Sequence, residues 1–417
     1  MKQILTLNKI SPEGLDVFDK TKYLCNSEVE APDAVMVRSA SMHEMELPKT
    51  VKAVARAGAG VNNIPIDKCT EQGIVVFNTP GGNANAVKEL VIAGLLMSAR
   101  KIYPSMQWAQ TLKGEGDQVP KLVESGKKQF VGPELAGKRL GVIGLGAIGV
   151  RVANLARHFD MEVLGYDPFL SVDAAWSLSR NVHHATSLKE IYETCDFITL
   201  HLPLNAETKG MINADTFQSM KHGVRILNFS RGELVNTEDM LEALKEKQVR
   251  CYVTDFPNDQ LLGQEGVLAI PHLGASTPES EDNCARMAAL QLRDYLENGN
   301  IKNSVNLPNV QVARHPGSVR FGIINRNVPA MISGISQIFA EAGANIENMT
   351  NKSRKDYAYT LVDLIGDVAI DEITAKLKAL ALNICLIIVR MYSFSHYFSP
   401  LYKTLIYNWL TQVIFSQ

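Results

Sequence analysis

Cysteine pairs, clustered metal ligands and an excess of charge of one sign are all missing from this 417-residue sequence. The six cysteines lie far apart with no Cys-x-x-Cys pair, so we expect buried free thiols and no disulfide framework. The adjacent His183 and His184 have no third ligand at a suitable spacing, so no metal site is expected. The formal net charge is only −2, from 42 Lys and Arg residues against 44 Asp and Glu residues. That balance leaves no basic field for a phosphate backbone and argues against a nucleic-acid partner.

Long apolar runs are missing as well. No run reaches the roughly 18 residues that a membrane-spanning helix needs, so no membrane partner is expected. Residues Met1–Leu7 lack the apolar region of a signal peptide and predict a first β-strand and a cytoplasmic location. The last residues, Leu382–Gln417, contain many aromatic residues and no acidic residue, but Arg390, Pro400 and Lys403 interrupt them.

Short β-branched runs alternate with longer helix-like stretches along most of the chain. The alternation over residues 1–100 is typical of an open parallel sheet, and residues 101–134 are more polar and predict a connection. A second unit follows, in which strands again alternate with helix-length segments. A capping box at Ser276–Glu279 opens a helix that runs to about Asn298 and could return the chain to the first unit. The sequence thus predicts an α/β fold with doubly wound sheets.

A smaller unit is expected after a linker at Arg314–Ser318. Its segments between Arg320 and Leu380 follow the order β-α-β-β-α, which needs one more strand to close the sheet. Only Leu386–Arg390 approximates that strand. Residues 391–417 look foreign to such a unit, and an altered reading frame near residue 381 is one hypothesis.

A glycine-rich loop follows the predicted strand Arg139–Ile143 and precedes a helix. The loop residues expected to contact a dinucleotide are Gly144, Gly146, Ala147, Ile148 and Gly149. The three glycines permit a tight turn, close approach of a pyrophosphate to the helix N-terminus, and close helix packing. Asp167 ends the next strand, where a carboxylate accepts hydrogen bonds from a ribose and repels a 2′-phosphate. This arrangement predicts NAD rather than NADP.

Further motifs follow this loop in a distinctive order. They are Asp167, His201–Pro203, Asn228–Gly232 and Pro271–Thr277. Together with the loop, they resemble the D-isomer-specific 2-hydroxyacid dehydrogenase family over about residues 1–310. Three N-terminal segments look most like the members that oxidise 3-phosphoglycerate: Val37–Ser39, Arg56–Asn63 and Asn78–Asn83. The small C-terminal unit resembles an ACT regulatory domain.

The resemblance implies three domains and an oligomer. A flavodoxin-like substrate-binding domain would span residues 1–100 and be completed by residues 285–310. A Rossmann NAD-binding domain would be inserted at residues 101–284, and a ferredoxin-like ACT domain would span residues 318–390. A homodimer or homotetramer is expected. The other residues expected to bind the cofactor are Leu202, Pro203, Phe229, Ser230, Asp255 and Gly274.

Oxidation of a 2-hydroxy acid needs a base, a cation and a hydride acceptor. His272 suits the base because imidazole titrates near neutrality, and Arg231 suits the cation through its guanidinium fork. In the family a carboxylate pairs with the histidine. The usual glutamate falls five residues after Asp255, where this sequence has Gln260. We expect Asp259, one position earlier, to take that role, with a weakened or water-bridged pair as the alternative.

The substrate residues are expected in the first unit. Arg38 and Arg56 end two of its strands and match family positions that face the substrate, where they would bind a phosphate. The backbone amides of Gly58, Ala59 and Gly60 would hold the carboxylate. Ala59 replaces the threonine that is common at this position, which removes one hydroxyl contact.

The function that the resemblance implies is NAD-dependent oxidation of 3-phosphoglycerate to 3-phosphohydroxypyruvate in L-serine biosynthesis. A hydroxypyruvate or glyoxylate reductase, or another D-2-hydroxyacid dehydrogenase, is one alternative, and it would not need the arginine pair. An NAD-sensing corepressor-like binding protein is an alternative of another class. If the C-terminal unit is an ACT domain, its loop Asn325–Pro329 would cradle a small amino acid, with serine as the effector.

Overall fold

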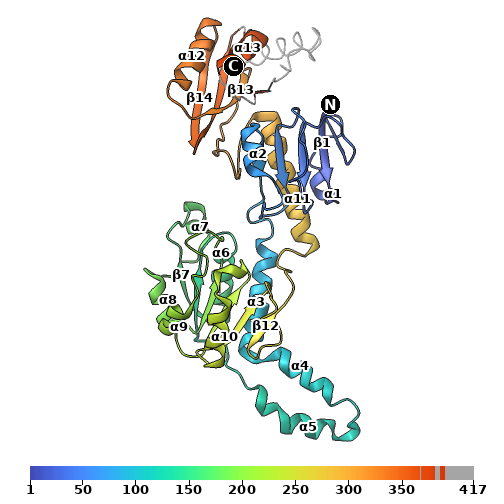
Figure 1. Ribbon diagram of the computed structural model, residues 1–417, viewed down its shortest axis with the longest axis vertical. Coiled ribbons are helices and arrows are strands. Elements are labelled where there is room, and N and C mark those ends of the chain that lie inside the picture. Colours follow the sequence, from blue (N-terminus) through green and yellow to red (C-terminus); the bar gives the residue numbers. More distant parts are fainter. Residues whose placement is uncertain (367, 381–385, 390–417) are drawn as a thin grey trace, which may run out of the picture. The chain divides into compact units, whose positions relative to one another are not determined.

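The computed structural model describes residues 1–366, 368–380 and 386–389, and these divide into two units. One unit contains Met1–Thr79 and the described residues from Ala285 onward, and the other contains Pro80–Cys284 (Figure 1). The hypothesis about residues 391–417 and the reading frame near residue 381 lies outside the described residues.

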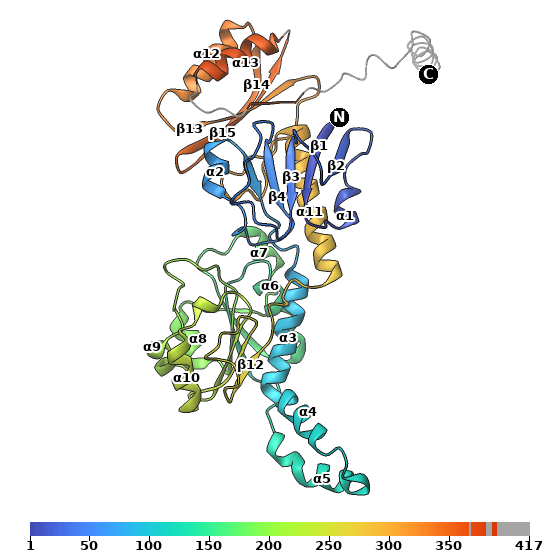
Figure 2. The same cartoon turned by 45° about the vertical axis from the view of Figure 1, so that its right-hand side comes forward.

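The first unit contains a five-stranded parallel sheet in the order β2-β1-β3-β4-β5 (Figure 2). Every residue of β3 is buried, as expected for a central strand of a parallel sheet. β2 was not predicted, since only its first residue is buried and its sequence lacks β-branched residues. The strands are β1 (Lys2–Leu7), β2 (Tyr23–Asn26), β3 (Ala34–Val37), β4 (Ala53–Arg56) and β5 (Val75–Phe77). The helices are α1 (Pro12–Leu15), α2 (Ile66–Glu71) and α11 (Pro278–Asn298), whose first turns belong to the other unit.

The second unit contains a seven-stranded parallel sheet in the order β12-β11-β10-β9-β6-β7-β8. The chain enters at β6 and builds outward on both sides, so the strand order reverses between β6 and β9. Ligands of open α/β sheets bind at the carboxyl ends of the strands near such a reversal. The strands are β6 (Arg139–Ile143), β7 (Glu162–Tyr166), β8 (His183–His184), β9 (Phe197–Leu200), β10 (Val224–Asn228), β11 (Val249–Thr254) and β12 (Val267–Ala269).

Both faces of this sheet are covered by apolar side chains. Leu227 and Val253 pack in one core with α3 and α6, while Ile226 and Tyr252 pack in the core on the opposite face. This alternation follows from the period of two along a strand. The helices of the unit are α3 (Ala84–Arg100), α6 (Gly149–Ala156), α7 (Val172–Ser177), α8 (Leu188–Thr194), α9 (Ala214–Ser219) and α10 (Thr237–Lys245). The two parallel sheets confirm the predicted α/β class.

The segment 101–134 is helical, whereas the sequence predicted only a polar connection. It contains α4 (Ile102–Thr111) and α5 (Val119–Gly126), which project from the rest of their unit (Figure 1). Within the described chain, neither helix has a buried residue. The Trp108 and Phe130 rings lie 5.3 Å apart between their centroids and hold the segment together. Val119, Leu122 and Val123 of α5 do recur at helical spacing, but the helix has only 8 residues, too few for the pattern to stand out from the polar residues around it.

The start of α11 differs by one residue from the prediction. The capping box was expected at Ser276, but the hydroxyl of Thr277 accepts the backbone N–H of Ser280 at 3.1 Å. Pro278 is the first residue of the helix, where its fixed φ fits and its missing N–H has no intrahelical partner to lose. The proline therefore sets the capping position.

Residues 319–389 form a four-stranded antiparallel sheet in the order β14-β15-β13-β16 with two helices. The elements follow the predicted β-α-β-β-α order, and β16 adds the fourth strand. They are β13 (Val319–Arg326), α12 (Met331–Glu341), β14 (Asn345–Arg354), β15 (Tyr357–Ile365), α13 (Ile370–Leu380) and β16 (Leu386–Val389).

Candidate active site

The glycine-rich loop connects β6 to α6 at the carboxyl edge of the seven-stranded sheet. Gly144 has a φ of +92°, and a Cβ there would lie 2.4 Å from the carbonyl oxygen of His201. A Cβ on Gly149 would lie 1.9 Å from the carbonyl oxygen of Gly144. No described atom lies within 4 Å of the corresponding position on Gly146. Two glycines are thus required by packing, and the third leaves the loop open to a ligand.

Asp167 ties this loop to the end of β7. Its Oδ2 accepts the backbone N–H of Leu145 at 2.8 Å, and its Oδ1 accepts the backbone N–H of Phe169 at 2.9 Å. Each carboxylate oxygen retains capacity for a further donor. The carboxylate therefore has acceptor capacity left at the end of β7, where the sequence predicts a contact with ribose.

His201 follows β9 on the other side of the reversal. Burial lowers the pKa of His201 to about 3, so the ring is neutral, and its Nε2 lies 3.0 Å from the Thr199 hydroxyl. Leu202 lies beside Gly144, where its Cδ2 would be 3.0 Å from an added Cβ, and Pro203 is exposed. These positions suit a nonreacting wall of the dinucleotide site.

Arg231 stands just after β10 in a turn that polar side chains hold in place. The buried Asn228 donates from Nδ2 to the carbonyl oxygen of Arg231 at 2.8 Å and to the Tyr252 hydroxyl at 3.2 Å. The Ser230 hydroxyl donates to the carbonyl oxygen of Leu200 at 2.6 Å. Sequence reasoning missed the positioning role of Asn228, although this residue opens the Asn228–Gly232 motif.

Asp255 follows β11 and is only 1% exposed. Within the part of the chain that the structure describes, neither of its carboxylate oxygens has a hydrogen-bond partner. Burial raises the pKa of Asp255, and the charges of His272 and Arg231 oppose that rise. A Cβ on Gly274 would lie 3.4 Å from Oδ2 of Asp255. The structure therefore places His272, Arg231 and the backbone amide of Gly274 around the buried Asp255 carboxylate, whose oxygens still have acceptor capacity.

His272 and Asp259 are both exposed. The His272 ring packs on Phe256, with 4.6 Å between the ring centroids. Among the described residues, no hydrogen bond or ion pair joins His272 to Asp259, and Gln260 is exposed beside it. The charge of His272 also acts on the nearby carboxyl of Asp255, whose pKa it lowers.

The substrate-binding candidates lie in the first unit and form a group of their own. The Nε of Arg56 donates to the carbonyl oxygen of Arg38 at 3.1 Å. A Cβ on Gly58 would lie 2.3 Å from Nη1 of Arg56, so the guanidinium covers this glycine. The Nδ2 of Asn78 donates to the carbonyl oxygen of Ala59 at 2.6 Å and holds the Gly58–Gly60 loop.

Neither a metal site nor a membrane-spanning helix is found among the described residues. No group of three or more His, Cys, Asp and Glu side chains there could hold a metal ion. No described helix combines the length and apolar character that crossing a membrane requires.

Comparison with known proteins agrees with this geometry. The chain is 35% identical over 327 residues to D-3-phosphoglycerate dehydrogenase of Synechocystis sp., which covers 74% of this chain and 56% of that protein. It is 35% identical over 299 residues to D-3-phosphoglycerate dehydrogenase of Methanocaldococcus jannaschii, covering 70% of this chain and 55% of that protein. The chain thus spans little more than half the length of these curated relatives.

A solved structure and a family model also match. The NAD⁺-bound 3-phosphoglycerate dehydrogenase of Entamoeba histolytica is 28% identical, with a TM-score of 0.58, covering 73% of this chain and 98% of that chain. The model of the D-isomer specific 2-hydroxyacid dehydrogenase NAD binding domain matches residues 92–274. This match confirms NAD as the predicted cofactor. It assigns residues 92–274 of the chain to the NAD-binding domain of the D-isomer-specific 2-hydroxyacid dehydrogenases.

Proposed function

We propose that this protein is an NAD-dependent dehydrogenase that oxidises D-3-phosphoglycerate to 3-phosphohydroxypyruvate, a step of L-serine biosynthesis. The observation that carries the proposal is the buried, unpartnered carboxylate of Asp255 between an imidazole and a guanidinium at the end of a dinucleotide-binding sheet. The names of the relatives in the comparison support the choice of substrate.

The residues at the edge of the sheet fit NAD. The amides of the Gly144–Gly149 loop would face the pyrophosphate, and Asp167 would accept the ribose hydroxyls. The orphaned oxygens of Asp255 would accept the carboxamide N–H group of the nicotinamide, which supplies the hydride acceptor when bound. The remaining side of the site would be lined by Leu202, Pro203, Phe229, Ser230 and Gly274.

His272 would act as the base, and Arg231 would stabilise negative charge on the substrate. The exposed imidazole of His272 would take the hydroxyl proton, and the guanidinium of Arg231 would bind the carboxylate and polarise the carbonyl oxygen that forms. Asn228 would keep Arg231 in position through its main chain. We propose Asp259 as the partner that orients His272, because its exposed carboxylate is free of other contacts among the described residues.

Arg38 and Arg56 would bind the phosphate of the substrate, and the Gly58–Gly60 amides its carboxylate. Support comes from the Arg56–Arg38 hydrogen bond, which places two guanidinium-bearing residues side by side at the ends of β3 and β4. A reductase of unphosphorylated hydroxy acids would not need this pair.

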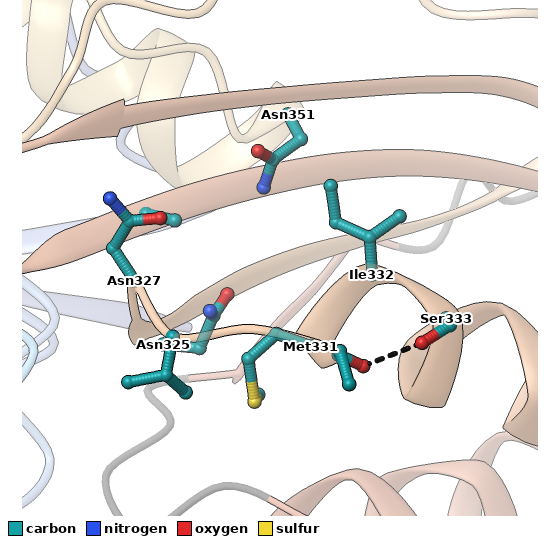
Figure 3. A pocket seen from close by; sticks show the side chains of 9 residues that line it. Asn325, Asn327, Met331, Ile332, Ser333 and Asn351 are labelled. Atoms are coloured by element: carbon teal, nitrogen blue, oxygen red, sulfur yellow. Dashed lines mark hydrogen bonds between the residues drawn. The ribbon is translucent and has the colours of Figure 1, made fainter.

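We also propose that residues 319–389 are an ACT-type regulatory domain that binds serine. A cavity of about 330 Å³ lies between the β13–α12 loop and β14 (Figure 3). Asn325 lines it and is only 1% exposed, and its Oδ1 has no partner among the described residues. That oxygen would accept an ammonium N–H, while the first amides of α12 would face a carboxylate. The other lining residues named in Figure 3 are Asn327, Met331, Ile332, Ser333 and Asn351.

We further infer that the protein is a homodimer or homotetramer. The exposed helix α4 carries Tyr103 and Met106, which are 51% and 62% exposed. In addition, β14 is an edge strand of 10 residues whose outer side has no described partner. Such edges are normally covered, and a second copy of the chain would cover both features.

Activity is the direct test of the proposed reaction. The wild-type protein should form NADH with D-3-phosphoglycerate much faster than with D-glycerate. Arg231→Lys and His272→Asn should each lower kcat by at least about 100-fold, because each removes a positioned group from the transition state. Binding of NAD, measured by calorimetry, should be retained. Near-normal turnover in either variant, or equal rates on the two substrates, would contradict the assignment.

Asp255→Asn should have opposite effects on stability and on NAD binding. Because the pKa of Asp255 in the folded protein lies above its ordinary value of 3.8, its ionisation opposes folding at neutral pH. The variant should therefore raise the free energy of unfolding without NAD by roughly 1 kcal/mol, a gain that disappears below about pH 4. NAD affinity should fall at least about tenfold because a charged acceptor is lost.

Denaturant unfolding at several pH values and calorimetry measure these two effects. Asp259→Asn, which alters an exposed carboxylate of the same loop, is the matched control and should change neither quantity. A destabilised Asp255→Asn variant with unchanged NAD affinity would show that the carboxylate is structural.

The partner of His272 is tested by the pH dependence of kcat/KM for 3-phosphoglycerate oxidation. Asp259→Asn should move the acid limb to lower pH, since an imidazolium without a neighbouring carboxylate loses its proton more readily. Gln260→Ala should leave the profile unchanged. The reverse pattern would assign the role to a water-bridged contact through Gln260.

Calorimetric titration of the full-length protein with L-serine tests the regulatory site. Wild type should release heat at millimolar ligand or below, and Asn325→Ala should not, because it removes the buried acceptor. Gln337→Ala alters an exposed amide on α12 and should bind as wild type does. If wild type shows no heat of binding, the domain is an assembly element and not a sensor.

A further inference from the structure

The strands β13 and β15 of the C-terminal sheet are buried on both faces, and the two faces belong to different cores. Phe321 and Val362 pack against α12 and α13. On the opposite face, Ile324 and Leu361 belong to the core of the five-stranded sheet and α11. Figure 2 shows β13 and β15 between α12 and α13 on one side and the first sheet on the other. The C-terminal sheet is therefore a layer of the first unit.

Arg320 is the polar anchor of this layer and is completely buried. Its Nε and Nη2 donate to the two carboxylate oxygens of Asp363, at 2.7 and 2.6 Å. Its other donors reach the carbonyl oxygens of Asn298 at 3.1 Å and of Val312 and Ala313 at 3.0 Å. All five N–H groups of the guanidinium are thus used. Three of them bind main chain outside the sheet, at the end of α11 and in the segment that leads to β13.

Tyr359 forms a second anchor on the same face. Its hydroxyl donates to the carbonyl oxygen of Gly299 at 2.6 Å, just after α11. A Cβ on Gly322 would lie 2.4 Å from this hydroxyl oxygen, and a Cβ on Gly299 would lie 3.1 Å from it. The absence of side chains at Gly322 and Gly299 therefore leaves the space that the Tyr359 hydroxyl occupies.

The docked sheet connects to the loop proposed to bind the substrate carboxylate. Nη1 of Arg354 donates to the carbonyl oxygen of Ser304 at 2.9 Å. The preceding residue, Asn303, accepts the backbone N–H of Asn78 at 3.4 Å, and the Asn78 side chain holds Ala59. A chain of direct contacts thus leads from β14 to the Gly58–Gly60 loop within one unit.

The proposed serine cavity borders this docked face. Asn325 and Ala358 line the cavity, and their neighbours in sequence are Arg326 and Tyr357. The Arg326 guanidinium lies 4.4 Å from the centroid of the Tyr357 ring, which belongs to the core shared with the first sheet. Because adjacent residues of a strand point to opposite faces, a ligand that orders the cavity wall also acts on the docked face.

We propose that the C-terminal sheet is a fixed layer of the substrate-binding unit, locked by Arg320 and Tyr359, and that the amino acid in the Asn325 cavity regulates the enzyme through this contact. The regulatory half rests on the proposed function, whereas the docking does not. Since the contacts end at the Gly58–Gly60 loop, the ligand changes the KM for the hydroxy acid. It leaves the affinity for NAD unaltered, because the dinucleotide residues belong to the other unit.

Two variants test whether Arg320 and Tyr359 hold the C-terminal sheet in place. The double variant Arg320→Met with Asp363→Leu removes both charges, so that no unpaired charge stays buried. Tyr359→Phe removes one oxygen and keeps the ring, and it should fold even if the double variant does not. Lys352→Met changes an exposed residue of β14 and is the control.

Hydrogen exchange of the full-length protein tests docking without any ligand. Amides of residues 299–304 and 312–320 should exchange slowly in wild type and in the control. They should exchange at least about tenfold faster in the double variant, with a smaller increase in Tyr359→Phe. Equal exchange in wild type and both variants would overturn the docking.

Kinetics with L-serine test the regulatory half. In wild type, serine should change the KM for 3-phosphoglycerate about fivefold with little change in NAD affinity. The variants should bind serine as wild type does by calorimetry, yet show a reduced or absent KM effect. A full KM effect in the double variant overturns the route through Arg320. If serine binds without changing the KM, the proposed regulation is wrong. If serine does not bind, the proposed effector is wrong, and the hydrogen-exchange result alone tests the docking.

Discussion

The arrangement of the active site depends on one carboxylate that is buried with its acceptor capacity unused. Asp255 lies at the end of β11, where the charges of His272 and Arg231 and the nearby backbone amides of Asp255 and Gly274 partly offset its loss of hydration. An unmet acceptor of this kind opposes folding, so its presence indicates a ligand that supplies the missing donor. The glycine loop and Asp167, which we propose to hold the dinucleotide, lie at the same edge of the sheet, and a dinucleotide bound there would give this acceptor a functional role.

The parts of the site that follow from local rules could be predicted from the sequence. The loop between β6 and α6 was recognised because its glycines serve backbone geometry, and Asp167 because a strand precedes it. The pairing of His272 with a carboxylate could not be decided in this way. Asp259 was chosen by its distance along the chain from Asp255, but whether a side chain reaches the imidazole depends on how the loop after β11 folds. The choice of Asp259 therefore stays a prediction, and the structure adds only that the charge of His272 lowers the pKa of the Asp255 carboxyl.

The elements that sequence reasoning missed share a physical cause. Helices α4 and α5 have no buried face in the described chain and are short, so their apolar residues do not stand out from the polar residues around them. Arg320 presents the opposite difficulty, because a single arginine in an apolar strand has the appearance of a surface cation. Only the five acceptors around it show that it is buried. Burial of a charge depends on its partners, and these come from distant parts of the chain.

The Arg320–Asp363 pair fixes the orientation of the C-terminal sheet on the first sheet more than it stabilises the contact between them. A buried ion pair recovers little more than the hydration free energy it loses, and apolar residues of similar volume stabilise a core at least as well. Tyr357, Tyr359 and Leu361 already supply apolar contact between the C-terminal sheet and the first sheet. Apolar contact alone, however, allows neighbouring orientations of similar free energy. A guanidinium whose five donors must each meet an acceptor allows only one orientation of the sheet. A contact with a single orientation can transmit a change in the Asn325 cavity to the Gly58–Gly60 loop.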